Sequence, residues 1–236
     1  MTLRFSCFVA GTDTGVGKTL VVAALLHKCR AQGWSALGMK PLAAGCEEST
    51  PGVWRNEDVE MLLAAGRLPD GVDMDVATLR ERINPYLFRE PLAPHIAAAH
   101  AGVRIDVAHI VDCFARLRDD TGVDAIVVEG AGGLLVPLDD ACDGGDLAQA
   151  LGIPLLLVVG MRLGCINHAL LTQEAIAARG LKFAGWIANR IDPAMSCFEE
   201  NLDTLHLRIK APLLGVVPYM SVPDPVLAAA CLQLPA

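Results

Sequence analysis

The sequence predicts an α/β fold built as a single domain, with a doubly wound, mainly parallel β-sheet flanked by helices. Short apolar runs bounded by glycine or proline alternate along the chain with longer segments of helical period. The apolar residues within these runs are contiguous, which is typical of strands that are covered on both faces. The 236 residues are 53% hydrophobic but only 5% aromatic, so we expect an aliphatic core.

The predicted strands and helices alternate, as a parallel sheet with right-handed crossovers requires. The apolar runs predict strands at residues 5–10, 36–39, 125–129, 155–159, 183–188 and 213–217. The segments of helical period lie near residues 18–32, 107–119, 166–179 and 197–209. Residues 43–102 are less regular and rich in proline, glycine and charge. We therefore expect a substrate-side insertion with short helical pieces there, within one domain that spans residues 1–236.

Residues 11–19 read GTDTGVGKT and match the phosphate-binding motif G-x-x-x-x-G-K-[ST]. They lie between a predicted strand and a predicted helix, which is the context that the motif requires. Glycines let successive backbone N–H groups point at phosphate oxygens beside the helix N-terminus. Lys18 is predicted to reach the β- and γ-phosphates, and the Thr19 hydroxyl to ligate Mg²⁺. The sequence thus predicts a P-loop fold that binds a nucleoside triphosphate.

Further charged side chains are predicted at the same edge of the sheet. Glu129 ends an apolar strand, and ligands of doubly wound sheets bind beyond the carboxyl ends of the strands, so we expect this carboxylate to face Mg²⁺. Lys40 ends the second predicted strand, where it is either a solvated cation or a group that neutralises a phosphorylated intermediate. Asp58 lies at a predicted helix start and is explained equally well by metal binding or by N-capping.

Charge and cysteine content exclude several classes of protein. The chain has 19 Lys and Arg against 27 Asp and Glu, a formal net charge of −8, so we expect no nucleic-acid partner. None of the eight cysteines has CxxC spacing, which predicts reduced, mostly buried thiols instead of a zinc or redox site. The N-terminus lacks the flanks of a signal peptide, and no apolar run approaches the ~20 residues of a membrane span. We expect a cytoplasmic protein without a membrane partner.

Taken together, these segments resemble the dethiobiotin synthetase family, the ATP-dependent carboxylases of biotin synthesis. The resemblance runs through nearly the whole chain. It rests on the phosphate loop and on residues 40–41, 55–58, 84–86, 94–95, 128–133, 164–168, 186–189 and 213–218. The phosphate loop and residues 129–133 are shared with related families. Residues 164–168, together with Lys40-Pro41 and Pro94-His95, are much more specific to this one.

The resemblance implies an ATP- and Mg²⁺-dependent cyclo-ligase that makes dethiobiotin. The diamine 7,8-diaminopelargonic acid takes up CO₂, from the CO₂/bicarbonate pool, as a carbamate. ATP phosphorylates the carbamate to a carbamic-phosphoric anhydride, and the second amine closes the ureido ring and releases phosphate. In such a reaction the protein mainly positions groups and neutralises charge.

Roles for individual residues are implied by the same resemblance. Lys18 and Lys40 are the implied catalytic residues, with Thr14 beside the substrate. The implied ligands of Mg²⁺ are Thr19, Asp58 and Glu129. The implied nucleotide contacts are Thr12, Asp13, Gly15, Val16, Gly17, Lys18, Thr19, Asp58, Glu129, Gly130, Ala131, Gly132, Asn189 at the adenine, and Pro218 and Tyr219 along the base pocket. The implied diamine contacts are Thr14, Lys40, Ala44, Gly164, Cys165, Ile166 and Asn167.

Residues 164–168 precede a predicted helix, whose N-terminus suits the carboxylate tail of the substrate. In the family this segment comes from the neighbouring subunit, so the resemblance implies a homodimer with a shared active site. Without the resemblance, the residues alone favour a different interpretation, with Asn167 as a helix cap and His168 as a surface histidine.

The chain departs from the family pattern at three positions. Gly15 stands where some members carry Glu, Ala44 where others have a small hydroxyl residue, and Tyr219 where Trp is frequent. The missing carboxylate and hydroxyl remove possible contacts with the substrate. We expect the three changes to affect affinity and nucleotide preference more than the type of reaction.

Two alternative functions fit the phosphate loop. One is a related P-loop amide ligase of the kind that acts on cobyrinic acid, although those enzymes usually carry a further glutamine-hydrolysing domain. The other is a dimeric partitioning-type ATPase switch, which places an extra lysine early in the phosphate loop, where this chain has Asp13. The chain also lacks a basic patch or amphipathic tail for DNA or membrane.

Overall fold

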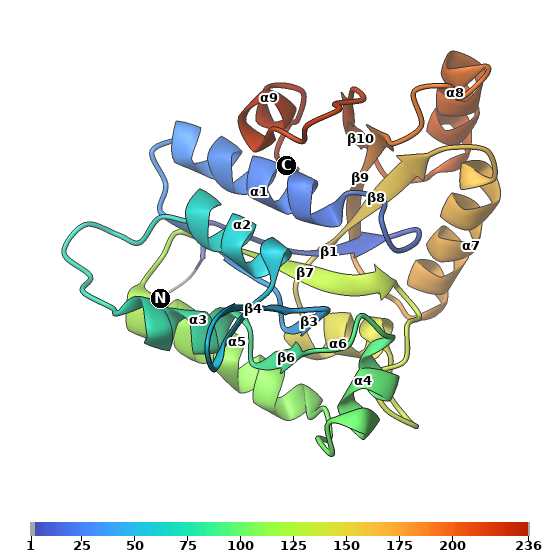
Figure 1. Cartoon of the computed structure of the whole chain (residues 1–236). Coiled ribbons are helices and arrows are strands. Elements are labelled where there is room, and N and C mark those ends of the chain that lie inside the picture. The colour runs from blue at the N-terminus through green and yellow to red at the C-terminus, as the bar shows by residue number, and fades with distance from the viewer. Residues whose placement is uncertain (1–2, 236) are drawn as a thin grey trace.

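The structure, a computed structural model, describes residues 3–235, which are built around a parallel β-sheet (Figure 1). Within this range the sheet has six strands: β1 (Phe5–Gly11), β2 (Ala36–Met39), β7 (Ala125–Gly133), β8 (Leu155–Met161), β9 (Phe183–Arg190) and β10 (Leu213–Val217). Their spatial order is β10-β9-β8-β1-β7-β2, and every pairing is parallel. The chain order reverses at β1, which lies between β7 and β8, and doubly wound sheets bind ligands at such a point.

The predicted strands and long helices are confirmed. Each predicted strand is a strand of the central sheet, and the strand ends differ from the prediction mainly at the carboxyl side of β7. The long helices are α1 (Lys18–Ala31), α5 (Val107–Thr121), α7 (Cys165–Ala178) and α8 (Phe198–Arg208). Two short helices were not predicted: α6 (Gly144–Leu151) and α9 (Pro225–Ala230). A capping box at Asp143 and Asp146 starts α6, a local signal that the apolar periodicity did not reveal.

Helices cover both faces of the sheet, which is why the strands are apolar throughout. Helices α1 and α9 pack on one face, and α5, α6, α7 and α8 pack on the other (Figure 1). Along β1, Cys7 and Val9 belong to the first core and Phe8 and Ala10 to the second. Alternate residues of one strand therefore fill two different aliphatic cores.

The segment between β2 and α5 is irregular, as predicted, but it also contains short strands that the sequence did not predict. Its elements are β3 (Leu42–Ala44), β4 (Glu47–Thr50), β5 (Val53–Arg55), α2 (Glu57–Ala65), α3 (Val76–Ile83), β6 (Tyr86–Phe88) and α4 (Pro94–His100). Strand β3 pairs in parallel with β6, and β4 and β5 form an exposed antiparallel hairpin. Strands of three or four residues are too short to show a period, so sequence patterns do not reveal them.

The cysteines are free thiols, as predicted. Five of the eight are buried, and Cys197 is exposed. Within residues 3–235, no helix combines the length and apolar character needed to cross a membrane.

Candidate active site

The phosphate loop joins β1 to α1 at the point where the strand order reverses. Gly17 precedes α1 with a left-handed φ of 85°, and a Cβ added there would lie 2.1 Å from Nδ2 of Asn189. Only glycine fits this position. The Asn189 amide, at the end of β9, donates to the Val16 carbonyl at 2.9 Å. The back of the loop is therefore held by a neighbouring strand.

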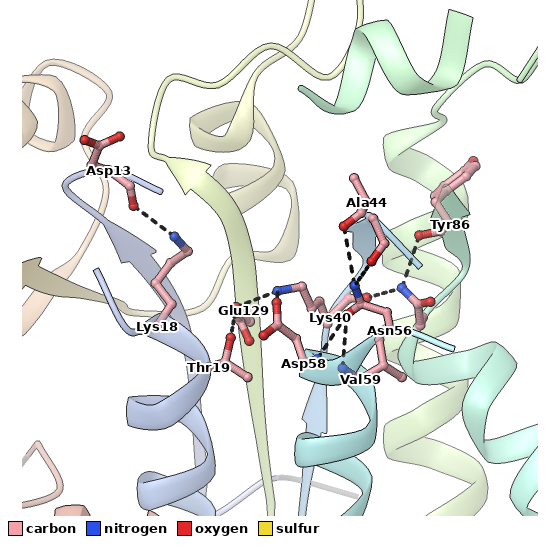
Figure 2. Close-up of polar contacts among 12 residues, drawn as sticks. Asp13, Lys18, Thr19, Lys40, Ala44, Asn56, Asp58, Val59, Tyr86 and Glu129 are labelled. Atoms are coloured by element: carbon pink, nitrogen blue, oxygen red, sulfur yellow. Dashed lines mark hydrogen bonds and ion pairs between the residues drawn. The ribbon is translucent and has the colours of Figure 1, made fainter. Parts of the chain in front are cut away.

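Lys18 is buried beneath this loop, and its ammonium donates to the backbone carbonyl of Asp13 at 3.1 Å (Figure 2). Burial lowers the pKa of Lys18 to about 8, against the opposing influence of Glu129. The Asp13 carboxylate accepts from the Thr14 N–H at 2.7 Å and from Nη2 of Arg162 at 2.5 Å. Arg162 follows β8, and nothing in the sequence pattern indicated that it contacts the phosphate loop.

Lys40, Glu129, Asp58 and Thr19 meet at the carboxyl end of β2, opposite the middle of β7 (Figure 2). The Lys40 ammonium donates to Oε1 of Glu129 at 2.8 Å and also contacts the Asp58 carboxylate. The Thr19 hydroxyl donates to the same Glu129 oxygen at 2.9 Å. Glu129 is 1% exposed, and its other oxygen, Oε2, has no hydrogen-bond partner among residues 3–235. The structure thus brings together the three side chains predicted to bind Mg²⁺.

Charge pairing decides the ionisation of this cluster. Burial alone would lower the pKa of Lys40, but Glu129 and Asp58 raise it above its ordinary value. Burial alone would raise the pKa of Asp58, but the Lys40 ammonium lowers it. Lys40 is therefore a buried, charged ammonium, and its interpretation as a solvated cation is wrong.

Asn56, not Asp58, caps helix α2. Its side-chain oxygen accepts from the backbone N–H groups of Asp58 and Val59 at 3.1 and 3.3 Å. The capping interpretation of Asp58 is therefore wrong, because the Asp58 carboxylate points away from the helix end toward Lys40 (Figure 2).

The oxygen atoms of the cluster fit a magnesium ion. Mg²⁺ prefers one or two protein carboxylates and fills the rest of its octahedral shell with water and phosphate oxygens. Asp58, Glu129 and the Thr19 hydroxyl supply such a set, and the unpartnered Oε2 of Glu129 is a buried acceptor that lacks a ligand. Across residues 3–235, no three His, Cys, Asp or Glu side chains gather in a metal-binding group.

A cavity of about 610 Å³ opens beside the cluster. The predicted site residues that line it are Thr14, Gly15, Gly17, Lys18, Thr19, Lys40, Ala44, Asp58, Glu129, Ala131 and Gly132. Its other wall is mostly apolar and comes from Leu42, Ala43, Phe88, Pro91, Leu92, Ala93 and Pro94. One cavity therefore has a charged end that suits phosphate and an apolar end that suits an alkyl chain.

The remaining predicted residues lie outside this cavity. They are Thr12, Asp13, Val16, Gly130, Asn189, Pro218 and Tyr219 for the nucleotide, and Gly164, Cys165, Ile166 and Asn167 for the diamine. The Thr12 hydroxyl accepts from the Gly160 N–H at 3.4 Å, and Gly130 packs closely on Phe8. Pro218 and Tyr219 are exposed directly after β10.

The start of α7 agrees only in part with the interpretation based on the residues alone: His168 is a surface histidine, as expected, but Asn167 is not the cap. Gly164 is the N-cap, with φ 95° and no side-chain capping bond, so the interpretation of Asn167 as a cap is wrong. Asn167 and His168 are exposed in the first turn of the helix, whereas Cys165 is buried.

Comparisons with known proteins identify the family. A family profile described as an AAA domain matches residues 6–225. An ATP-dependent dethiobiotin synthetase from Aromatoleum aromaticum is 57% identical over 235 residues, with 100% of both chains covered. Another from Janthinobacterium sp. is 47% identical, with 99% of this chain and 96% of the relative covered. The chain belongs to the ATP-dependent dethiobiotin synthetase family. As a member of this family it is an ATP-dependent ligase, as the sequence predicted.

Solved structures outside the dethiobiotin synthetase family share the fold. MinD of Pyrococcus horikoshii, solved with Mg-ADP, has a TM-score of 0.54 at 17% identity and covers 95% of this chain and 86% of its own. A ParA family ATPase from Chlorobium tepidum reaches 0.55 at 12% identity, covering 92% and 86%. Cobyrinic acid a,c-diamide synthase from Mycobacterium smegmatis reaches 0.52 at 15% identity, covering 97% and 92%. At such identities these likenesses show the P-loop fold alone.

Proposed function

We propose that the chain converts 7,8-diaminopelargonic acid, CO₂ and ATP to dethiobiotin, ADP and phosphate. The observation that carries this proposal is the single cavity in which the phosphate loop and the Lys40 cluster face an apolar wall. A diamine with an alkyl chain and a nucleotide with a reactive phosphate can occupy the two ends of such a cavity together. The names of the curated relatives support the same product.

The reaction we propose has three bond-forming steps. An amine nitrogen attacks CO₂ and loses a proton, which gives a carbamate. A carbamate oxygen then attacks the γ-phosphorus, and the bond to the ADP oxygen breaks. Finally the second amine attacks the carbamate carbon and loses its proton, and the bond to phosphate breaks as the ring closes.

The two lysines would balance the charge that moves during phosphoryl transfer. Lys18 lies in the phosphate loop, where it can turn from the Asp13 carbonyl to the β- and γ-phosphates. Lys40 lines the cavity between the loop and the apolar wall, next to the place where the carbamate oxygen must meet the phosphorus. An ammonium is a compact charge on a flexible stem, which suits a migrating phosphoryl group. Thr14 lines the same cavity and would contact the substrate.

Thr19, Asp58 and Glu129 would hold Mg²⁺, which neutralises phosphate oxygens when it is bound. The same two carboxylates hold the Lys40 ammonium. Glu129 and Asp58 can therefore exchange the ammonium for the metal, and that exchange would direct Lys40 to the carbamate. Ala131 and Gly132 border the cavity on the side of β7.

The predicted residues outside the cavity would complete the site in two ways. Asn189 lies at the end of β9, and Pro218 and Tyr219 follow β10, on the side of the phosphate loop where a base can extend. Following the family resemblance, Gly164 to Asn167 would bind the diamine carboxylate in the cavity of a second copy; they do not line the cavity of their own chain. We include in the proposal that the chain is a cytoplasmic homodimer and that residues 1–236 act as one catalytic domain.

Product analysis tests this function. ADP release should require both the diamine and bicarbonate, and dethiobiotin should appear in equal amount. ATP turnover that is indifferent to the diamine would exclude the ligase reaction and favour an ATPase switch. In Lys40→Ala, turnover should be lost while ATP binding survives, and full turnover would remove Lys40 from the mechanism.

A further inference from the structure

Two asparagines near the cavity have no part in the chemistry described above. Asn56 and Asn84 are 7% and 9% exposed. Asn56 lies beside the Lys40 cluster (Figure 2), and Asn84 contacts the Lys40 backbone. A buried amide is costly unless its donors and acceptors are paired. The partners of each amide therefore indicate what the side chain holds in place.

Asn84 holds the beginning of the segment that carries Lys40. Its amide donates to the Lys40 carbonyl at 2.7 Å and to the Tyr86 carbonyl at 3.1 Å. The Lys40 backbone N–H donates in turn to the carbonyl of Ile83 at 2.8 Å. Both backbone groups of Lys40 are thus bound to residues 83–84, which fixes where its side chain starts.

Asn56 holds the other end of the same segment. Its amide donates to the carbonyls of Gly45 at 3.1 Å and Ala44 at 3.4 Å. The two amides hold the two ends of the segment 40–45. Within this segment, Lys40, Leu42, Ala43 and Ala44 line the cavity. Gly45 also approaches Pro91 of the same apolar wall, because a Cβ added to Gly45 would lie 3.0 Å from Cβ of Pro91.

The oxygen of the Asn56 side chain positions the residue that carries the metal carboxylate, Asp58. This oxygen caps α2 through the N–H groups of Asp58 and Val59. The oxygen and the nitrogen belong to one planar amide, so Asp58 and the wall at residues 44–45 cannot shift independently. We infer that Asn56 is a positioning residue that couples the Mg²⁺ carboxylate Asp58 to the diamine wall formed by residues 42–44. This inference rests on the proposed function for the identity of the two ligands.

Substitutions can remove the contacts of the Asn56 nitrogen with residues 44–45 while keeping the helix cap formed by its oxygen. Serine caps helices about as well as asparagine, but it is shorter and has no amide to reach residues 44–45. In Asn56→Ser, the KM for the diamine should rise about five- to twenty-fold, as expected for one or two lost hydrogen bonds. The Kd for Mg-ATP, measured by calorimetry without the diamine, should stay within about twofold of wild type.

Two further variants and a control complete the experiment. Asn56→Asp keeps the capping oxygen in an isosteric side chain, and it should show the same separation between diamine KM and Mg-ATP Kd. Asn56→Ala removes both the helix cap and the contacts with residues 44–45, so the diamine KM and the Mg-ATP Kd should both rise. The control is Asp75→Ser at the exposed N-cap of α3, where the Asp75 carboxylate accepts from the Thr78 N–H at 2.9 Å, and neither constant should change.

Three results would overturn the inference. The first is a diamine KM within about twofold of wild type in both Asn56→Ser and Asn56→Asp. The second is a parallel change of diamine KM and Mg-ATP Kd in these two variants. The third is loss of folding, by circular dichroism, in both, which would assign Asn56 a structural role only. Failure of the proposed function looks different, because the wild type itself would then release no ADP in response to the diamine.

Discussion

Replacing Lys40 with methionine should destabilise the metal-free protein by about 3–5 kcal/mol. Methionine has a similar volume, so the substitution removes the charge and leaves little cavity. The cost arises because Glu129 is 1% exposed and loses the Lys40 ammonium as a donor, while the bond from the Thr19 hydroxyl remains. The contact with Asp58 adds little to this cost, because the Asp58 side chain is 41% exposed and water can solvate it.

Magnesium should recover part of this loss. A cation bound by Glu129 and Asp58 replaces the missing ammonium, and a ligand at a hundred times its Kd stabilises the folded state by about 2.7 kcal/mol. In the wild type the gain should be smaller, because Mg²⁺ must first displace the Lys40 ammonium.

Urea unfolding at several Mg²⁺ concentrations measures both effects. The matched control is Lys182→Met, since Lys182 is exposed, and its free energy of unfolding should stay within about 0.5 kcal/mol of wild type. The reasoning fails if Lys40→Met costs less than about 1 kcal/mol, or if Mg²⁺ stabilises the wild type and Lys40→Met equally.

Three other substitutions test separate parts of the structure. Glu129→Gln removes one of two carboxylates, so the Mg²⁺-dependent gain in nucleotide affinity should fall about tenfold or more by calorimetry, whereas metal-free binding should not weaken. Gly17→Ala should abolish ATP binding in a fluorescent-nucleotide assay, because its Cβ would meet the Asn189 amide at 2.1 Å, and normal binding would contradict the loop geometry. Hydrogen bonds from Ser35 lower the pKa of Asp124, so Asp124→Asn should cost about 1–2 kcal/mol at pH 7. This stabilisation is present above the pKa that Asp124 has in the unfolded chain, and it is lost as the pH falls through its lower pKa in the folded protein. The free energies of unfolding of the wild type and Asp124→Asn should therefore converge as the pH falls below about 4. A difference that stays constant with pH would contradict the assignment.

Local signals account for the parts of the site that were predicted correctly. The phosphate loop is contiguous, and its glycines, Lys18 and Thr19 lie within nine residues. Glu129 was predicted to face the same edge as the end of its strand, since parallel strands end at a common edge. The expected strand end is wrong, because β7 runs on to Gly133, but the shorter neighbour β2 ends opposite Val128 and leaves Glu129 facing the site. The outcome is a hydrogen bond between Thr19 and Glu129, which are 110 residues apart.

Other contacts were beyond any local pattern. Asn56 and Asn84 belong to motifs that carried the family resemblance, yet their partners are backbone carbonyls of another segment. Carbonyls are identical at every residue, so the sequence contains no signal for which one an amide will meet. Arg162 reaches Asp13 only because β8 lies beside β1.

The sequence by itself determined the class of fold, the phosphate loop and the family, because apolar periods and glycine spacing are properties of neighbouring residues. The tertiary structure alone decided the state of Lys40, which from its position could equally have been a solvated cation. Strand β7, which pairs with β2, and the first turn of α2 enclose Lys40 between Glu129 and Asp58. Burial and charge pairing arise from groups brought together across the sheet, and these together turn one lysine among five into a buried, paired ammonium at the centre of the candidate site.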